Sequence, residues 1–285
     1  MSVSNNISAA PIGVFDSGIG GITVLRELLR TLPAEHFIYI GDDKNSPYGT
    51  RTAEEIKQLS LALIKHPKFE GIKTLVVACN TITAAALDVI SENFEGPVIG
   101  VIKPGVEAAL ATTKNNKLGI LATTATVNSK VFDTAIKAAN PEISITSVAA
   151  PKLHEYAENS LDIILNAPTQ DIKECVIEHV EPFINAGCDT ILLACTHFPP
   201  YEALIRDIVG SAVNIIDPSV NTAEALRATL KEKNLTNNRS SYQTAPQISA
   251  PPTSQGNHGF VNNNFEIIST AGNNEKYKKF SEMIL

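Results

Sequence analysis

The chain has 285 residues, a hydrophobic content of 44% and a formal net charge of −7 at pH 7. This size and composition suit one large or two ordinary globular domains, whereas an acidic chain without a long Lys/Arg run argues against a nucleic-acid surface or a polybasic membrane patch. No apolar stretch approaches the length of a membrane span, and the first residues lack the pattern of a secretory signal, so we expect a cytoplasmic protein.

Short apolar runs alternate with longer amphipathic segments along the chain. The apolar runs are typical of buried parallel strands and cover 12–15, 37–41, 74–79, 98–102, 118–122, 143–149, 190–195 and 213–217. The amphipathic segments predict helices over 23–32, 53–65, 82–94, 129–139, 169–187 and 220–233. This repeated order of strand and helix predicts an α/β fold with mostly parallel sheets.

The composition changes over 234–264, which is rich in Asn, Ser, Gln, Pro and Gly. Such a segment predicts a mobile loop, and we expect no chemistry from it. Order is expected to return with 265–270 and with a final amphipathic helix over 274–285.

Two cysteines lie in near-copies of one context, TLVVACNTIT at 74–83 and TILLACTHFP at 190–199. A weaker echo relates IGVFDSGIG at 12–20 to LGILATTAT at 118–126, in the same order. Paired echoes in one order predict a duplicated α/β unit, although buried strands also resemble one another by chance. We therefore expect two pseudo-symmetric lobes, each a mostly parallel sheet flanked by helices, with the active site in the cleft between them.

The expected crossings between the lobes lie near 102–104 and near 214–218. The first lobe would then comprise 11–103 plus 215–285, and the second lobe would comprise 104–214. The carboxyl ends of parallel strands form the usual ligand crevice. Polar or reactive side chains follow four of the predicted strands at this edge, namely Asp16, Cys79, Thr123 and Cys195.

The paired cysteines suggest acid/base chemistry rather than a disulfide or a metal centre. A lone cysteine ending a buried strand is usually a packing residue, and the cysteine spacing fits no ordinary zinc template. Thiols presented by two facing lobes could remove a proton from one face of a carbon atom and deliver a proton to the other face. His197 follows Cys195 closely enough to tune or reprotonate it, whereas Cys175 and Cys188 lack such a context.

Four motifs occur in one order along the chain: DSGIGG at 16–21, PYG at 47–49, ACNT at 78–81 and CTHFP at 195–199. Together they resemble the glutamate racemases of the aspartate/glutamate racemase superfamily, over about 11–230 and weakly from 265. The resemblance implies interconversion of L- and D-glutamate without pyridoxal phosphate or metal, and a supply of D-glutamate for peptidoglycan synthesis. It also implies that the chain can form a homodimer.

The resemblance further implies roles for individual residues. Cys79 would take the proton from D-glutamate with help from Asp16, and Cys195 would take it from L-glutamate with help from His197. Glu158 would be the acidic partner of His197, although Glu155 is close enough in the sequence to be the alternative. Substrate contacts would come from Ser17, Pro47, Tyr48, Gly49, Asn80, Thr81, Thr123, Thr126 and Thr196.

The sequence departs from the family pattern most clearly near Glu158. The corresponding segment of the family begins Cys-Pro, whereas this chain has Ala150 before the proline and carries Lys152 and His154. Three other functions remain open at this point: racemisation of another small acid such as aspartate, non-catalytic amino-acid binding, and dithiol redox chemistry. The third would require the two thiols to approach within disulfide distance.

Overall fold

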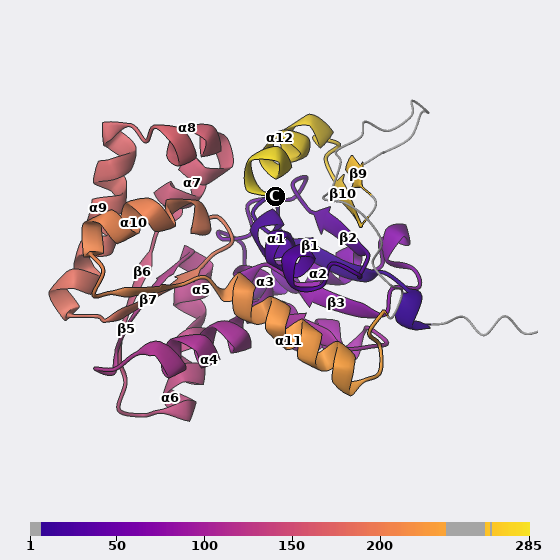
Figure 1. Cartoon of the computed structure of the whole chain (residues 1–285), viewed down its shortest axis with the longest axis horizontal. Helices are drawn as coiled ribbons and strands as arrows, with labels where there is room; N and C mark the ends of the chain where they lie inside the picture. Colours follow the sequence, from indigo (N-terminus) through magenta and orange to yellow (C-terminus); the bar gives the residue numbers. More distant parts are fainter. Residues whose placement is uncertain (1–6, 238–259, 263) are drawn as a thin grey trace, which may run out of the picture.

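The computed structural model describes residues 7–237, 260–262 and 264–285. It contains two separate sheets, which lie side by side with helices around each (Figure 1). The six-stranded sheet has the order β4-β3-β1-β2-β10-β9, and the four-stranded sheet has the order β6-β5-β7-β8. All pairs are parallel except β9 with β10.

The strands are short, as the apolar runs predicted. They are β1 Ile12–Asp16, β2 Phe37–Gly41, β3 Thr74–Val77, β4 Val98–Gly100, β5 Lys117–Ala122, β6 Ser144–Ala149, β7 Thr190–Ala194, β8 Asn214–Ile216, β9 Phe260–Asn262 and β10 Phe265–Ser269.

The helices fill the intervals between the strands. They are α1 Ile22–Thr31, α2 Ala53–Leu63, α3 Asn80–Glu92, α4 Ile102–Thr112, α5 Thr124–Ser129, α6 Val131–Ala139, α7 Pro151–Asn159, α8 Leu161–Asn166, α9 Gln170–Ala186, α10 Glu202–Val209, α11 Pro218–Glu232 and α12 Asn274–Ile284. Short 3₁₀ turns cover Ile7–Ala9, Pro67–Phe69 and Pro199–Tyr201.

The two sheets repeat one strand order. In the first sheet β4-β3-β1-β2 are neighbours, and in the second sheet β8-β7-β5-β6 are neighbours in the matching sequence order. Cys79 therefore follows β3 and Cys195 follows β7, at equivalent places in the two units. This is the arrangement expected of a duplicated α/β unit.

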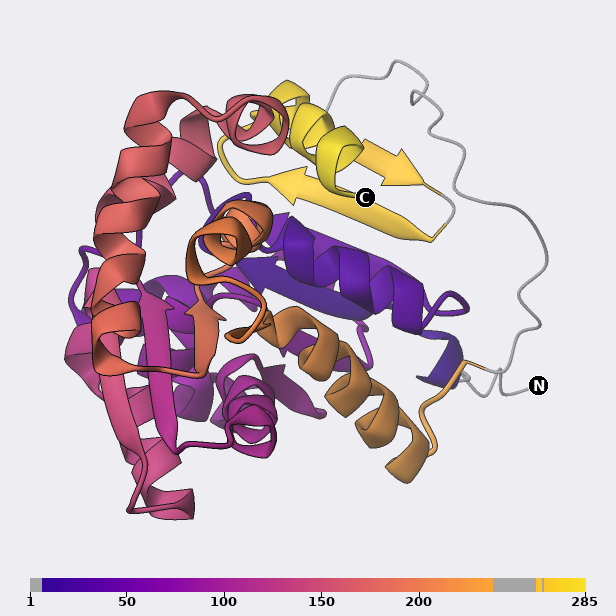
Figure 2. The ribbon, with the colours of Figure 1, turned by 60° about the vertical axis from the view of Figure 1, so that its left-hand side comes forward.

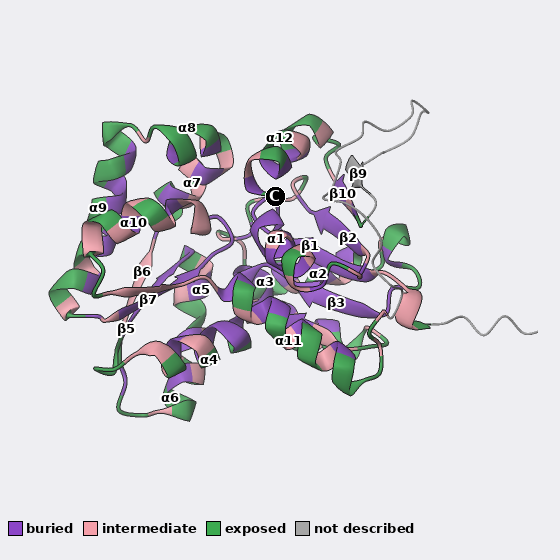
Figure 3. Cartoon of the chain, viewed as in Figure 1, coloured by how far each residue is buried: buried purple, intermediate pink, exposed green. Residues whose placement is uncertain are grey.

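Each sheet is buried on both faces (Figures 2 and 3). Because successive residues of a strand face opposite sides, Ile12 and Val14 of β1 pack with α1, α11 and α12, whereas Phe15 packs with α2 and α3. In the second sheet, Leu193 packs with α7, α9 and α10, and Leu192 packs with α4 and α6. Helix α11 contacts both α1 and α4, so it joins the lobes away from the cleft.

Several helices were absent from the expectation drawn from the sequence, namely α4, α5, α7, α8 and α10. The run 98–102 was read as one strand, but β4 ends at Gly100 and Ile102 begins α4, because an apolar run does not by itself distinguish a strand from a buried helix. None of the helices in the described ranges has the length and apolar character needed to cross a bilayer.

The predicted mobile loop over 234–264 is wrong at its end. Residues Phe260–Asn262 form β9, which pairs antiparallel with β10 in the first sheet. At the start of the segment, the backbone N–H of Asn237 donates to Glu35 at 2.8 Å. The part of this prediction that falls on residues 238–259 and 263 lies outside the described residues.

Candidate active site

The first lobe contributes a buried acid and a buried thiol. Asp16 ends β1, and its Oδ2 accepts hydrogen bonds from the backbone N–H groups of Gly18 (3.3 Å) and Gly21 (3.1 Å). Cys79 occupies the N-cap position of α3, and its Sγ lies 3.4 Å from Ser17 Oγ. The glycine-rich loop after β1 thus holds a carboxyl group and a hydroxyl group beside the Cys79 thiol.

Burial favours the protonated forms of both groups in this half of the site. Asp16 is 0% exposed, and burial raises its pKa while the charge on His197 opposes that rise. Burial also raises the pKa of Cys79, and the charge on Asp16 raises it further. The Ser17 contact works in the opposite direction but is weaker. Cys79 is therefore a thiol at neutral pH.

The second lobe contributes a thiol, an imidazole and a carboxylate in line. His197 Nδ1 lies 4.0 Å from Cys195 Sγ, and His197 Nε2 lies 2.8 Å from Glu158 Oε2. Glu158 comes from α7, which begins two residues after the end of β6. Both acidic candidates left open by the sequence line the neighbouring cavity, but Glu158 is the one that contacts His197.

The imidazole and the carboxylate form an ion pair. Burial by itself lowers the pKa of His197, but contacts with Cys195 and Glu158 outweigh burial and raise it to about 10. Burial raises the pKa of Glu158, but His197 and Lys276 outweigh burial and lower it to about 2. His197 is therefore positively charged at neutral pH and can stabilise negative charge on the sulfur of Cys195.

The two halves of the site meet at a close seam. A Cβ atom at Gly20 would lie 2.5 Å from both His197 Nδ1 and Thr196 Oγ1, so only glycine fits there. The Thr23 hydroxyl donates to the Thr196 carbonyl at 3.2 Å. The glycine-rich loop of the first lobe is thus seated directly on the Cys-Thr-His segment of the second lobe.

A second cross-lobe contact consists of threonine hydroxyls. Thr81 Oγ1 of α3 lies 3.0 Å from Thr123 Oγ1 and 3.3 Å from Thr126 Oγ1. The Thr123 side chain also caps α5 by accepting from the Thr126 N–H. Next to this cluster, the Ala125 N–H donates to the Gly49 carbonyl at 3.2 Å. Four of the substrate contacts expected from the sequence are thereby brought together.

A cavity of about 420 Å³ opens between the lobes at this point. Its lining includes Pro47, Gly49, Thr123, His154, Glu158 and Lys276. Tyr48 is arranged differently from the expectation, because it is 1% exposed and donates its hydroxyl to Asp42 at 2.5 Å. The Asn80 Oδ1 atom is buried without a hydrogen-bond partner among the described residues, which leaves it free to accept from a ligand.

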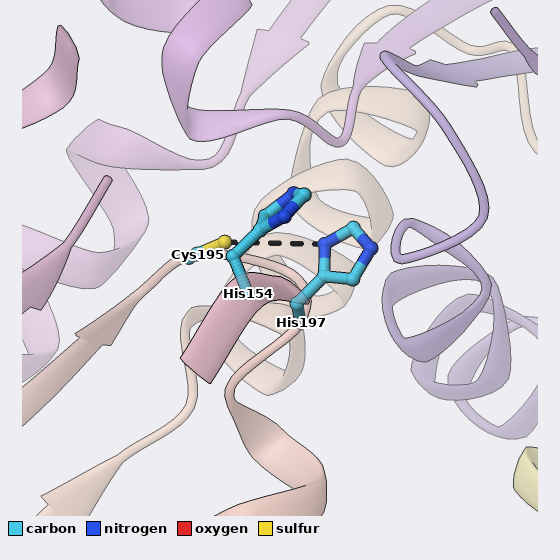
Figure 4. Close-up of side chains that lie close together, drawn as sticks. All are labelled: His154, Cys195 and His197. Carbon is cyan, nitrogen blue, oxygen red and sulfur yellow. Dashed lines mark hydrogen bonds between the residues drawn. The ribbon is translucent and has the colours of Figure 1, made fainter. Parts of the chain in front are cut away.

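Two residues of the site were not singled out as functional in the sequence. Lys276 of α12 forms an ion pair with Glu158, although 118 residues separate them along the chain. His154 stacks beside His197 with ring centroids 4.1 Å apart, and Figure 4 shows both rings near Cys195. The His197 charge is the main cause that lowers the pKa of His154 to about 3, so His154 is neutral at physiological pH. No local sequence pattern indicates that either residue belongs to the site.

Comparison with known proteins gives one family. Residues 12–226 match the family model described as Asp/Glu/Hydantoin racemase. The chain is 41% identical over 224 residues to the glutamate racemase of Listeria innocua, covering 79% of this chain and 82% of that protein. It is 37% identical over 226 residues to the glutamate racemase of Acidothermus cellulolyticus, covering 79% and 84% respectively.

A solved structure has the same architecture over nearly the whole chain. The crystal structure of glutamate racemase from Francisella tularensis in complex with D-glutamate superposes with a TM-score of 0.78 at 29% identity. The match covers 98% of this chain and 94% of that one. The two-lobed α/β arrangement is therefore the same in both proteins.

Proposed function

Because the chain belongs to the Asp/Glu/Hydantoin racemase family, we propose that it interconverts L- and D-glutamate with Cys79 and Cys195 as its two proton carriers. The observation that carries this proposal is the equivalent placement of the two thiols. Each follows the matching strand of a repeated unit, and each has its own buried titratable neighbour, Asp16 for Cys79 and the His197–Glu158 pair for Cys195.

The charges in the site set the starting protonation state. Cys195, beside the His197 imidazolium, is placed to act as the base, and Cys79, a thiol beside Asp16, is placed to act as the acid. Cys195 removes the Cα proton of L-glutamate, and Cys79 donates its proton to the opposite face to give D-glutamate. After the reaction, Cys195 carries the proton taken from L-glutamate and Cys79 is the thiolate. In this state, Cys79 can accept the Cα proton of D-glutamate, which is the reverse reaction.

Stabilisation of the carbanion has to come from the protein's own polar groups. Helix α3 begins at Asn80, directly after Cys79, and the positive partial charge of its N-terminus can bind the substrate carboxylate. The buried Asn80 Oδ1 is free to accept from the substrate ammonium group. A positioned acid/base group contributes about 10²–10⁴-fold, so oriented dipoles in a closed cleft supply the remainder.

Glutamate is favoured over aspartate by the activity of the relatives with which this chain shares most of its length. His197 supports the same assignment, because aspartate racemases commonly have Glu at the corresponding place after Cys-Thr. D-Glutamate made by this chain would supply peptidoglycan synthesis. Assays with both L-glutamate and L-aspartate compare the two substrates directly.

The test is racemisation of each enantiomer in D₂O, without added cofactor, in wild type, Cys79→Ser and Cys195→Ser. Wild type should place solvent deuterium at Cα of the product, and both variants should lose ~10²-fold or more of their racemisation rate. Cys79→Ser retains the base for L-glutamate and should exchange the Cα proton of that enantiomer only. Cys195→Ser should exchange the proton of D-glutamate only.

The matched control is Cys188→Ser, which alters a buried thiol outside the site. It should racemise as wild type does, with equal kcat/KM in the two directions because the enantiomers have equal free energy. Glutamate binding without deuterium exchange in wild type would replace this proposal with a non-catalytic binding protein. Undiminished racemisation by either single-thiol variant would refute the two-thiol mechanism.

A further inference from the structure

Three potential metal ligands converge on the second-lobe side of the site. In the part of the chain that the structure describes, His154, Cys195 and His197 each present a ligand atom, and these atoms all lie within 4.8 Å of one another (Figure 4). Two come from the Cys-Thr-His segment after β7, and His154 comes from the first turns of α7. Racemisation as proposed above requires only Cys195 and His197 of these three.

We propose that His154, Cys195 and His197 form an inhibitory binding site for a thiophilic divalent cation such as Zn²⁺. Thiolate and neutral imidazole are the ligands that Zn²⁺ prefers, and three protein ligands with an open fourth position are a common coordination number. Ligand atoms in a tetrahedral zinc site lie about 3.5 Å apart, given Zn–N and Zn–S bonds of ~2.0 and ~2.3 Å. A movement of the order of 1 Å in the side chains closes the observed cluster to that spacing.

The surroundings of His197 suit it as a ligand. Its Nε2 is hydrogen-bonded to Glu158 Oε2 at 2.8 Å. This leaves Nδ1, the nitrogen that faces Cys195, to bind the cation. A carboxylate on the non-ligating nitrogen of a histidine is the usual support of zinc ligands, because it fixes the ring and increases its basicity. Glu158 is fixed in turn by Lys276.

His154 supplies both the third ligand and the route of entry. It lines the cavity between the lobes, whereas Cys195 is 5% exposed and His197 is 2% exposed. A cation entering through the cavity therefore meets His154 first and then reaches the two buried ligands.

Binding at this site has a defined proton balance. The cation displaces the Nδ1 proton of His197, together with the thiol proton of any Cys195 that is not already ionised, and the protons pass to solvent. Cys195 then cannot accept a proton from the substrate. This consequence for activity rests on the function proposed above, but formation of the site does not.

The first experiment uses Co²⁺ as a spectroscopic substitute for Zn²⁺, titrated into the whole chain under reducing conditions. Wild type should develop a near-ultraviolet thiolate-to-cobalt band and visible bands of tetrahedral Co²⁺, and Zn²⁺ should abolish both. His154→Asn should weaken Co²⁺ binding by ~10-fold or more, and Cys195→Ser should remove the near-ultraviolet band. The control His66→Asn alters a histidine outside the cluster and should titrate as wild type does.

The second experiment measures inhibition in zinc-buffered solution, relative to the uninhibited rate of each variant. His154→Asn should need ~10-fold or more free Zn²⁺ than wild type or His66→Asn for half-inhibition. Equal Co²⁺ affinity in wild type and His154→Asn, or a thiolate band that persists in Cys195→Ser, would overturn the site. The expected cobalt spectrum in a chain that does not racemise glutamate would uphold the site and refute the proposed function instead.

Discussion

Replacing Glu158 with Gln tests whether the ion pair between Glu158 and His197 keeps the His197 imidazole protonated. Glutamine preserves the size and one hydrogen-bonding oxygen but removes the negative charge. In the native protein, burial lowers the pKa of His197, yet contacts with Cys195 and Glu158 raise it to about 10. Without the carboxylate, less remains to counter the lowering of the His197 pKa by burial. His197 of the variant should therefore lose its proton at a lower pH than in wild type.

The size of the effect follows from the two partners. The pKa of Glu158 is lowered from 4.5 to about 2, which corresponds to about 3 kcal/mol at ~1.36 kcal/mol per pH unit. Burial opposes this lowering and Lys276 shares in it, so about 3 kcal/mol gives the order of magnitude for the pair with His197. Removing it shifts the pKa of His197 from about 10 to about 8. At pH 9, the protonated fraction of His197 then falls from ~90% to ~10%, whereas at pH 7 it barely changes.

The assay is kcat/KM for L-glutamate from pH 6 to 10.5, followed by the optical signal of the enantiomers. Glu158→Gln should be ~10-fold less active than wild type at pH 9 but should approach wild type near pH 7. Since folding raises the pKa of His197 and lowers the pKa of Glu158, the contribution of the pair to stability is complete between about pH 4.5 and pH 6.5. It disappears as the pH rises through about 10, and it also disappears as the pH falls through about 2. Thermal melts of the two proteins should therefore converge at high pH.

The matched control is Glu155→Gln, which neutralises a carboxylate on the same helix that contacts the cavity but not His197. It should keep the alkaline limb of the wild-type profile. The reasoning fails if Glu158→Gln loses activity by the same factor at pH 7 and pH 9, or if Glu155→Gln moves the alkaline limb instead. In the first case the residue would act through shape rather than through charge.

Two further predictions concern a close contact at Gly20 and a buried ion pair. Gly20→Ala places a Cβ atom 2.5 Å from His197 Nδ1 and should reduce kcat/KM by ~10²-fold, whereas in the control Gly18→Ala the nearest atom lies at 3.5 Å and kinetics should be near wild type. The buried Lys73–Glu35 pair, joined at 2.5 Å, should make Lys73→Met less stable by ~3–5 kcal/mol in urea unfolding. The double variant Lys73→Met/Glu35→Leu should regain most of that loss, and an equally unstable double variant would contradict this account.

The buried strands and the paired thiols were predictable because their signals are local. Strand β7 is apolar after its first residue, Thr190, and ends directly before Cys195, so both the strand and the reactive segment beyond it can be read from consecutive residues. The equivalent strand before Cys79, β3, also consists of a threonine followed by apolar residues. The repeated sequence pattern also indicated the two lobes, because two similar segments of sequence are expected to form two similar α/β units.

The remaining parts depend on contacts that no local pattern encodes. Lys276 reaches Glu158 only because β10 joins the first sheet and directs α12 toward the second lobe. His154 reaches His197 only because β6 and β7 belong to one sheet, so that the helix after β6 lies beside the segment after β7. Strand β9 was missed because its polar surroundings suggested a loop, while its pairing with β10 supplies the backbone hydrogen bonds that the composition alone does not.

The repeated strand order has a consequence for the symmetry of the reaction. An isolated lobe carries one thiol of the pair and could address only one face of a planar carbanion. Two identical lobes would address both faces, but with the same neighbour beside each sulfur. A single chain that contains both lobes allows the neighbours to differ, with the Asp16 carboxyl on one side and the His197 imidazolium on the other. In the proposed reaction, mirror-image ligands would thus be handled by a protein that is not itself mirror-symmetric, and the protons carried by the two thiols at rest would determine which enantiomer can react first.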